Sequence, residues 1–108
     1  MSETAQRPVS HSVYFKLNER TPEAAEALVA ECKEKLDGHP GVLAFNVGVL
    51  GTGFDRPVND NDFDVALYLL FENRAAHDMY QVSDRHQSYI STNKEKWAQV
   101  RVFDAEVV

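Results

Sequence analysis

The stretch from Asp64 to His86 reads DVALYLLFENRAAHDMYQVSDRH, and it contains the pattern of a strand followed by a helix. The run from Val65 to Phe71 is apolar throughout and has the length of a buried strand. Asn73 then offers a side-chain cap for a helix that we expect to continue to about Val82. We therefore take a strand that leads directly into a helix as the unit around which the chain is organised.

The elements on either side follow from periodicity and from helix-end signals. Residues His11 to Leu17 alternate between two faces, as a strand does. Thr21 and Pro22 begin a helix that is expected to end at about Leu36, before Gly38. The remaining predictions are strands at Val42–Leu50, Phe63–Phe71 and Val100–Val107, and a helix that resumes after Ser83-Asp84 and runs to about Ala98.

The order β-α-β-β-α-β predicts an α+β fold of the ferredoxin-like class, a four-stranded antiparallel sheet with helices on one face. At 108 residues the chain has the size of one domain. Residues 1–9 are polar and are predicted to be a flexible tail, and residues 10–108 are predicted to form the domain.

The predicted third strand is apolar on both faces, which a sheet with one solvated face would not require. One layer of helices covers only one face, so the other face needs a second cover. Closed two-fold homo-oligomers are the commonest assemblies. The sequence therefore predicts a homodimer that forms through the open sheet face bearing Tyr14, Tyr68 and Leu70.

Composition and charge argue against several classes of partner and location. The formal net charge is −6, from 11 basic and 17 acidic residues, so we expect neither a nucleic-acid partner nor binding to an anionic membrane. The apolar run is too short to span a bilayer, and the N-terminus has no secretory pattern. A single cysteine, Cys32, excludes an intrachain disulfide, and a cytoplasmic location is the default expectation.

An ordered set of short motifs resembles the stress-responsive dimeric α/β-barrel (Dabb) family. The set begins at His11-Ser-Val-Tyr-Phe-Lys-Leu and covers nearly the whole domain, to about Glu106. Its other members are Pro40-Gly41-Val42, Leu69-Leu70-Phe71-Glu72, Tyr80, His86, Trp97 and Phe103-Asp104. The resemblance implies the same ferredoxin-like fold, with two sheets packed face to face into a dimeric barrel.

The resemblance also implies candidate site residues. Some members of the family are stress-associated proteins without a firm activity, and a plant member closes a linear polyketide by acid/base aldol chemistry. Its functional histidines and tyrosine fall on positions that match His11, Tyr80 and His86. We therefore expect these three side chains to converge on one pocket between the helices and the sheet.

In an enzyme, His86 would be the general base, Tyr80 the donor to a developing oxyanion, and His11 the group that orients the substrate. Apolar walls would suit a small ligand that bears a carbonyl or an enol. The residues expected to form these walls are Val13, Phe15, Leu28, Leu67 and Trp97.

Other interpretations remain open at the level of sequence. His11 fits a buried histidine bonded to the backbone, His86 a surface residue, and Tyr80 the edge of the core. The whole protein fits a non-catalytic stress or small-molecule-binding protein. A third interpretation is an oxygenase that handles haem or a quinone, and it rests only on analogy with other dimeric α+β barrels.

Metal and cofactor sites are not predicted. No pair of histidines has a spacing such as HxxxH, and His39 and His77 are expected to face solvent. The aspartates between Asp55 and Asp64 lack the pattern of a calcium loop and are interpreted as solvated. Cys32 lies on the predicted buried stripe of the first helix, and we interpret it as structural.

Overall fold

The computed structural model describes residues 7–108, and within them the strands and helices occur in the predicted order. The first six residues of the predicted tail lie outside the described residues. The elements are β1 (Val9–Leu17), α1 (Pro22–Leu36), β2 (Val42–Val49), β3 (Val65–Phe71), α2 (Arg74–Val82), α3 (Asp84–Asn93), the short 3₁₀ helix η2 (Lys94–Lys96) and β4 (Trp97–Glu106).

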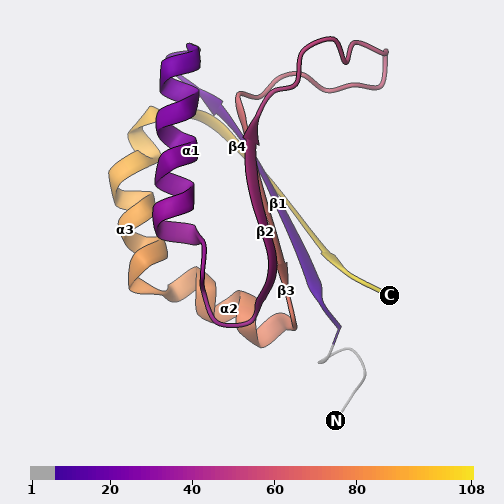
Figure 1. Ribbon diagram of the computed structural model, residues 1–108, viewed down its shortest axis with the longest axis vertical. Helices are drawn as coiled ribbons and strands as arrows, with labels where there is room; N and C mark the ends of the chain where they lie inside the picture. The colour runs from indigo at the N-terminus through magenta and orange to yellow at the C-terminus, as the bar shows by residue number, and fades with distance from the viewer. Residues whose placement is uncertain (1–6) are drawn as a thin grey trace.

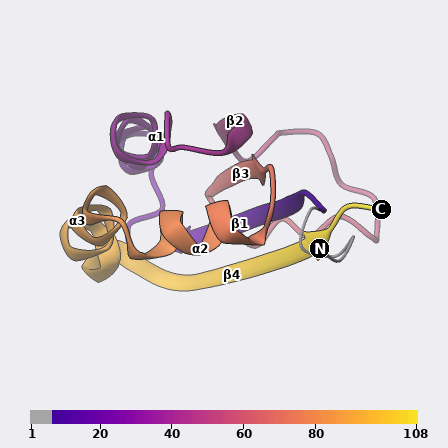
Figure 2. The same cartoon turned by 90° about the horizontal axis from the view of Figure 1, so that it is seen from below.

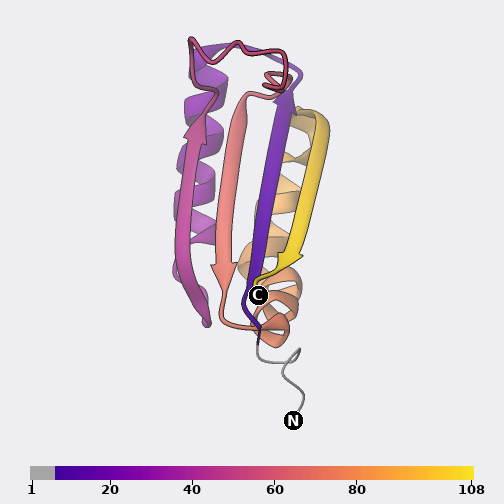
Figure 3. The same cartoon turned by 90° about the vertical axis from the view of Figure 1, so that its right-hand side faces the viewer.

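The four strands form one antiparallel sheet in the order β2-β3-β1-β4 (Figure 3). β1 and β3 are the central strands, and Val13 of β1 lies opposite Leu67 of β3. On its other side β1 pairs with β4, where Val13 lies opposite Val102. This arrangement is the ferredoxin-like α+β fold that the sequence predicts.

The helices cover one face of the sheet and leave the other open (Figures 1 and 2). β1 and β3 alternate between buried and half-buried residues along their whole length, as strands with one face in the core do. The core residues of β3 are Val65, Leu67, Leu69 and Phe71. The open face therefore presents the other half of β3, with Ala66, Tyr68 and Leu70 only partly buried.

The predicted caps start the first helix of each crossover, α1 and α2. The Thr21 hydroxyl accepts a hydrogen bond from the Ala24 backbone nitrogen at 3.1 Å, at the start of α1. The Asn73 side chain accepts one from the Ala76 nitrogen at 2.9 Å, at the start of α2. Each bond satisfies a backbone donor that has no partner within its helix, which fixes where the helix begins. Within residues 7–108 no helix has the length and apolar character needed to cross a membrane.

The end of the second crossover differs from the prediction. The helix predicted to reach Ala98 ends at Asn93, and η2 reverses the chain into β4. Trp97 is therefore the first residue of β4 and pairs with Leu17 across a register shift. Aromatic residues such as Trp97 favour strands. The pairing of Trp97 with β1 therefore prevails over the helical pattern of the residues before it.

The connection between β2 and β3 extends away from the helices, over the open side of the sheet (Figure 1). Its carboxylates contact side chains and a backbone donor of the sheet, and a basic side chain of the connection between β1 and α1. Asp60 pairs with Arg101 at 2.5 Å. Asp64 accepts a hydrogen bond from the Leu17 backbone nitrogen at 2.8 Å and pairs with Arg20 at 3.2 Å. These contacts give the aspartates a structural role in holding the loop against the sheet.

Candidate functional site

A cavity of about 320 Å³ lies between the β1–β4 side of the sheet and helices α2 and α3. Its walls combine apolar side chains with several groups that can carry or move a proton. The lining residues are His11, Val13, Phe15, Leu67, His77, Tyr80, Gln81, His86, Ile90, Trp97, Val100, Val102 and Asp104. An apolar cavity with a few convergent polar groups is the usual form of a small-molecule site.

The break between α2 and α3 brings His86 over Tyr80. Ser83 ends α2 and caps α3, and its hydroxyl donates to the Tyr80 carbonyl at 2.9 Å and accepts from the His86 backbone nitrogen at 3.2 Å. The rings of Tyr80 and His86 meet edge to face with their centroids 4.8 Å apart. A single serine thus joins the backbone of the two residues at the helix break.

His11 reaches the same cavity from β1. It lies opposite Asp104 in the sheet, and its Nδ1 is 2.5 Å from Asp104 Oδ1. The His11 ring is 6.0 Å from the Tyr80 ring and 5.3 Å from the His77 ring, between centroids. The structure therefore brings His11, Tyr80 and His86 to one cavity, which is the arrangement that the catalytic hypothesis requires.

Burial shifts the proton affinities of these groups in opposite directions. Removal from water lowers the pKa of His86, and the neighbouring histidines add to this effect. Burial also lowers the pKa of His11, against the opposing effect of the hydrogen bond to Asp104. Burial raises the pKa of Tyr80. At neutral pH the site therefore contains a neutral imidazole able to accept a proton beside a phenol able to donate a hydrogen bond.

Four of the five predicted wall residues line this cavity, and Leu28 does not. Val13, Phe15, Leu67 and Trp97 are among the lining residues. Leu28 is buried, but it lines a separate hollow of about 300 Å³ between α1 and the end of β1. The prediction for Leu28 is wrong because α1 packs against α3, β2 and β3 rather than against α2, and Leu28 faces the end of β1 and η2.

Two histidines that were expected to face solvent are instead packed inside. His39 is buried, its Nε2 is 2.9 Å from the Lys35 carbonyl, and its ring contacts Tyr80 at 5.0 Å between centroids. The His77 side chain is only 13% exposed and lines the cavity beside His11. Its position one residue after buried Ala76 and three before Tyr80 is a helical-face signal that could have found it.

Asp104 is another titratable residue of the cavity for which the sequence predicted no role. It shares a face of β4 with Val100 and Val102, and all three line the cavity. Asp104 follows Val100 and Val102 at alternating positions of the predicted last strand. This alternation places its carboxylate on the same face as the two valines, and it is the signal that could have pointed to Asp104.

Cys32 has the structural role that was predicted for it. Its side chain is fully buried, and its Sγ lies 3.3 Å from the Tyr89 hydroxyl. Burial raises the pKa of the thiol to about 11, so the reactive thiolate is scarce at neutral pH.

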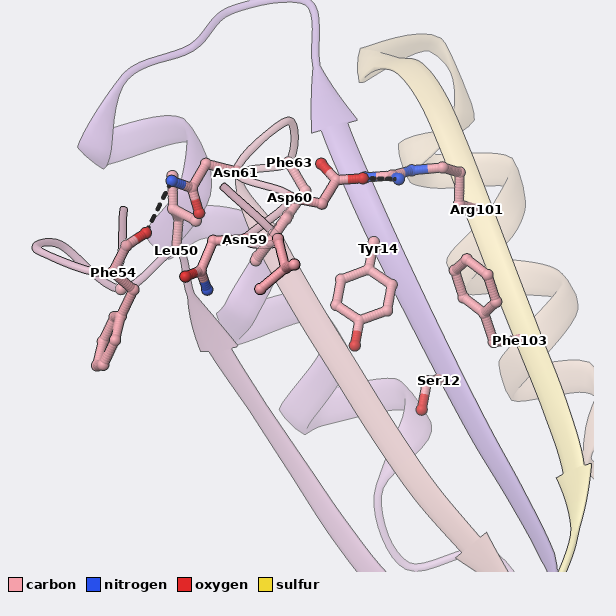
Figure 4. Close-up of a pocket in the computed structure, with 12 residues that line it drawn as sticks. Ser12, Tyr14, Leu50, Phe54, Asn59, Asp60, Asn61, Phe63, Arg101 and Phe103 are labelled. Atoms are coloured by element: carbon pink, nitrogen blue, oxygen red, sulfur yellow. Dashed lines mark hydrogen bonds and ion pairs between the residues drawn. The ribbon is translucent and has the colours of Figure 1, made fainter. Parts of the chain in front are cut away.

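A larger hollow of about 530 Å³ lies on the open face, beneath the β2–β3 loop (Figure 4). Tyr14 and Phe103 flank it, and the Asp60–Arg101 pair crosses its rim. It lacks the histidines of the first cavity and belongs to the face that the sequence assigns to a partner. We therefore take the cavity between sheet and helices as the candidate site.

Comparison with known proteins supports the same fold. A comparison with curated protein sequences gives no match. A Dabb family protein with a ferredoxin-like fold from Mesorhizobium loti superposes with a TM-score of 0.77 at 18% identity, over 95% of this chain and 99% of that one. A dimeric ferredoxin-like protein of unknown function from Thermobifida fusca gives 0.75 at 15% identity, over 94% and 92%.

A hydroxynitrile lyase from Passiflora edulis gives a TM-score of 0.76 at 13% identity, over 95% of both chains. At these identities the likeness concerns the fold alone. The model of the stress responsive A/B barrel domain matches residues 9–107, which is nearly the whole chain. By that match the chain belongs to the stress responsive A/B barrel (Dabb) family.

Proposed function

We propose that the protein is an acid/base enzyme of the cyclase or lyase type that acts on a small apolar compound bearing a carbonyl or an enol. The observation that carries the proposal is the contact of the Tyr80 and His86 rings, at 4.8 Å, on the wall of an otherwise largely apolar cavity. A hydroxynitrile lyase among proteins of the same fold supports a catalytic role for this scaffold.

In this proposal His86 removes a proton from the carbon next to the carbonyl. Its Nδ1 is buried and has no hydrogen-bond partner among the described residues, so a lone pair can be free to accept the proton. The electron pair of the broken C–H bond moves to the carbonyl oxygen, where the Tyr80 hydroxyl donates a hydrogen bond to the forming enolate. Return of the proton from His86 to carbon or to a leaving group completes the cycle.

His11 has an orienting role in the proposal. Its contact with Asp104 at 2.5 Å fixes the ring on the wall of the cavity, where the rings of His11 and His86 both meet Tyr80. From there the imidazole can bond a second polar group of the ligand. The apolar side chains of the cavity favour an aromatic or aliphatic body.

Enolisation can be measured without knowing the natural substrate. We would incubate aryl methyl ketones and β-diketones with the protein in D₂O and follow loss of the exchangeable C–H signal by proton NMR. The proposal predicts exchange above the buffer rate, and His86→Gln should lower the protein-dependent rate by about 10²–10⁴. Tyr80→Phe should lower it by about 10²–10³, because it removes one oxyanion donor.

Met79→Ala is the matched control, since Met79 lies on the same helix as Tyr80 with 67% of its surface exposed. This variant should exchange at the wild-type rate. Equal exchange by wild type and His86→Gln, at a rate above buffer, would refute the role of His86.

A second candidate is a non-catalytic protein that binds the same class of ligand. The burial of Tyr80, whose exposed fraction is only 2%, favours this alternative because little of the phenol is accessible. Saturable ligand binding, with exchange at the buffer rate for every compound bound, would establish it in place of the enzyme.

We further propose that the protein forms a homodimer through the open face of the sheet. Tyr14 packs edge-on against Phe63 at 5.1 Å and Phe103 at 5.8 Å, and Phe103 remains 55% exposed. Tyr68 and Leu70 of β3 are only partly buried on the same face. The dimeric description of a neighbour with this fold supports the proposal.

A further inference from the structure

Three possible metal ligands from three different elements meet at one end of the cavity. They are His11 of β1, His77 of α2 and Asp104 of β4, and one ligand atom from each lies within 4.8 Å of the other two. Asp104 Oδ1 is 2.5 Å from His11 Nδ1 and 3.8 Å from His77 Nε2. The residues are far apart in sequence, which explains why histidine spacing alone gave no indication of the cluster.

The hydrogen bonds of His77 leave one of its nitrogens without a partner. Nδ1 lies 2.9 Å from Asp78 Oδ1, so in the neutral ring the proton belongs on Nδ1. Nε2 then has a lone pair, is buried, and makes no hydrogen bond within the described part of the chain. This lone pair faces the Asp104 carboxylate at 3.8 Å, an arrangement that a positive charge between the two atoms would stabilise.

We propose that His11, His77 and Asp104 bind a divalent transition-metal ion of the zinc class. Imidazole and carboxylate ligands favour such ions over Mg²⁺ and Ca²⁺, which prefer oxygen ligands alone. Asp78 supports the assignment, because ligating histidines commonly donate their other N–H to a carboxylate. The proposal goes beyond the acid/base function and does not depend on it.

Small side-chain movements are enough to form the site. Tetrahedral ligands about 2.0–2.1 Å from zinc lie roughly 3.3 Å from each other. The 2.5 Å contact must therefore lengthen, and the 3.8 Å gap must shorten. The Asp104 side chain is 45% exposed and has room to turn. Because the three ligands also line the cavity, the remaining coordination position can face a water molecule or a bound ligand.

Cobalt(II) reports such a site directly, because its visible spectrum depends on coordination geometry. Tag-free, metal-stripped protein would be titrated with Co²⁺ and then with Zn²⁺ as a competitor. The proposal predicts saturation at one Co²⁺ per protomer, visible bands typical of nitrogen and oxygen ligation, and complete displacement by Zn²⁺. Asp78→Ala should weaken Zn²⁺ binding by about 10–100-fold, because it removes the hydrogen-bond acceptor of a ligating histidine.

His77→Gln and Asp104→Asn should each abolish the cobalt bands, and circular dichroism would confirm that both variants fold. His86→Gln is the matched control: it removes a histidine from the same cavity but from outside the cluster, and it should bind Co²⁺ like the wild type.

A wild-type protein that takes up no Co²⁺ or Zn²⁺ would overturn the proposal. A proton shared by His77 and Asp104 would then balance the negative charge of the carboxylate. Uptake that His77→Gln leaves unchanged would overturn it too. Both readouts are independent of proton exchange on a ketone, so failure of the metal site and failure of the acid/base function can be told apart.

Discussion

Replacing Ser83 with alanine tests how the site is assembled. The Ser83 hydroxyl caps α3 through the His86 nitrogen at 3.2 Å and bonds the Tyr80 carbonyl at 2.9 Å. Loss of an N-cap typically costs about 1 kcal/mol, within a range of roughly 0.5–2. Ser83 is only partly buried, so water can replace its bond to the Tyr80 carbonyl at little further cost. We therefore expect Ser83→Ala to lower the free energy of unfolding by about 1 kcal/mol.

Urea denaturation followed by circular dichroism, at fixed protein concentration, measures this change. The midpoint should fall without a change in slope, and the melting temperature should fall by about 4–8 °C for a domain of this size. The same variant should exchange ketone protons more slowly, because a displacement of about 1 Å at a catalytic group can cost about 10²-fold in rate. Ser83→Thr keeps the hydroxyl and should preserve both properties. A stability loss below about 0.3 kcal/mol with unchanged exchange would refute the role assigned to Ser83.

Three further predictions concern the interface, the thiol and the pH dependence of stability. Tyr68→Asp combined with Leu70→Asp places two charges on the open face and should convert a dimer into monomer or aggregate by light scattering; a wild-type monomer at micromolar concentration would contradict the interface. Cys32 should resist iodoacetamide at pH 8 in the native protein and react once urea unfolds it, because burial raises its pKa to about 11; rapid native labelling would exclude the packing described. Burial lowers the folded-state pKa of His86 below its ordinary 6.5, so the unfolded chain binds the proton more readily. The contribution of His86 to stability is therefore complete above pH 6.5 and decreases as the pH falls below it, and His86→Gln should remove that part of the pH dependence measured by urea unfolding.

The fold follows closely from local patterns in the chain. Alternation predicted β1, the caps at Thr21 and Asn73 predicted the starts of the helices, and the run from Val65 to Phe71 predicted the central strand. Trp97 was misplaced because the reversal at η2 has no strong glycine or proline signal, and only pairing with β1 defines the start of β4.

The site could be predicted only in part, because its members meet through tertiary packing. The approach of His86 to Tyr80 depended on a visible helix break at Ser83. The pairing of His11 with Asp104 depends instead on the register between the first and last strands, and a single sequence does not specify that register. Leu28 was assigned to the wrong hollow for a similar reason: its burial was predictable, but the position of α1 over the sheet was not.

A crystal structure of the protein with the tightest-binding ketone or enol from the exchange screen would test the central claim most directly. The account predicts the ligand inside the cavity between sheet and helices, with its oxygen about 2.6–3.2 Å from the Tyr80 hydroxyl and its reactive carbon beside His86. A ligand found in the open-face hollow between Tyr14 and Phe103, with the cavity at Tyr80 and His86 unchanged, would contradict the account.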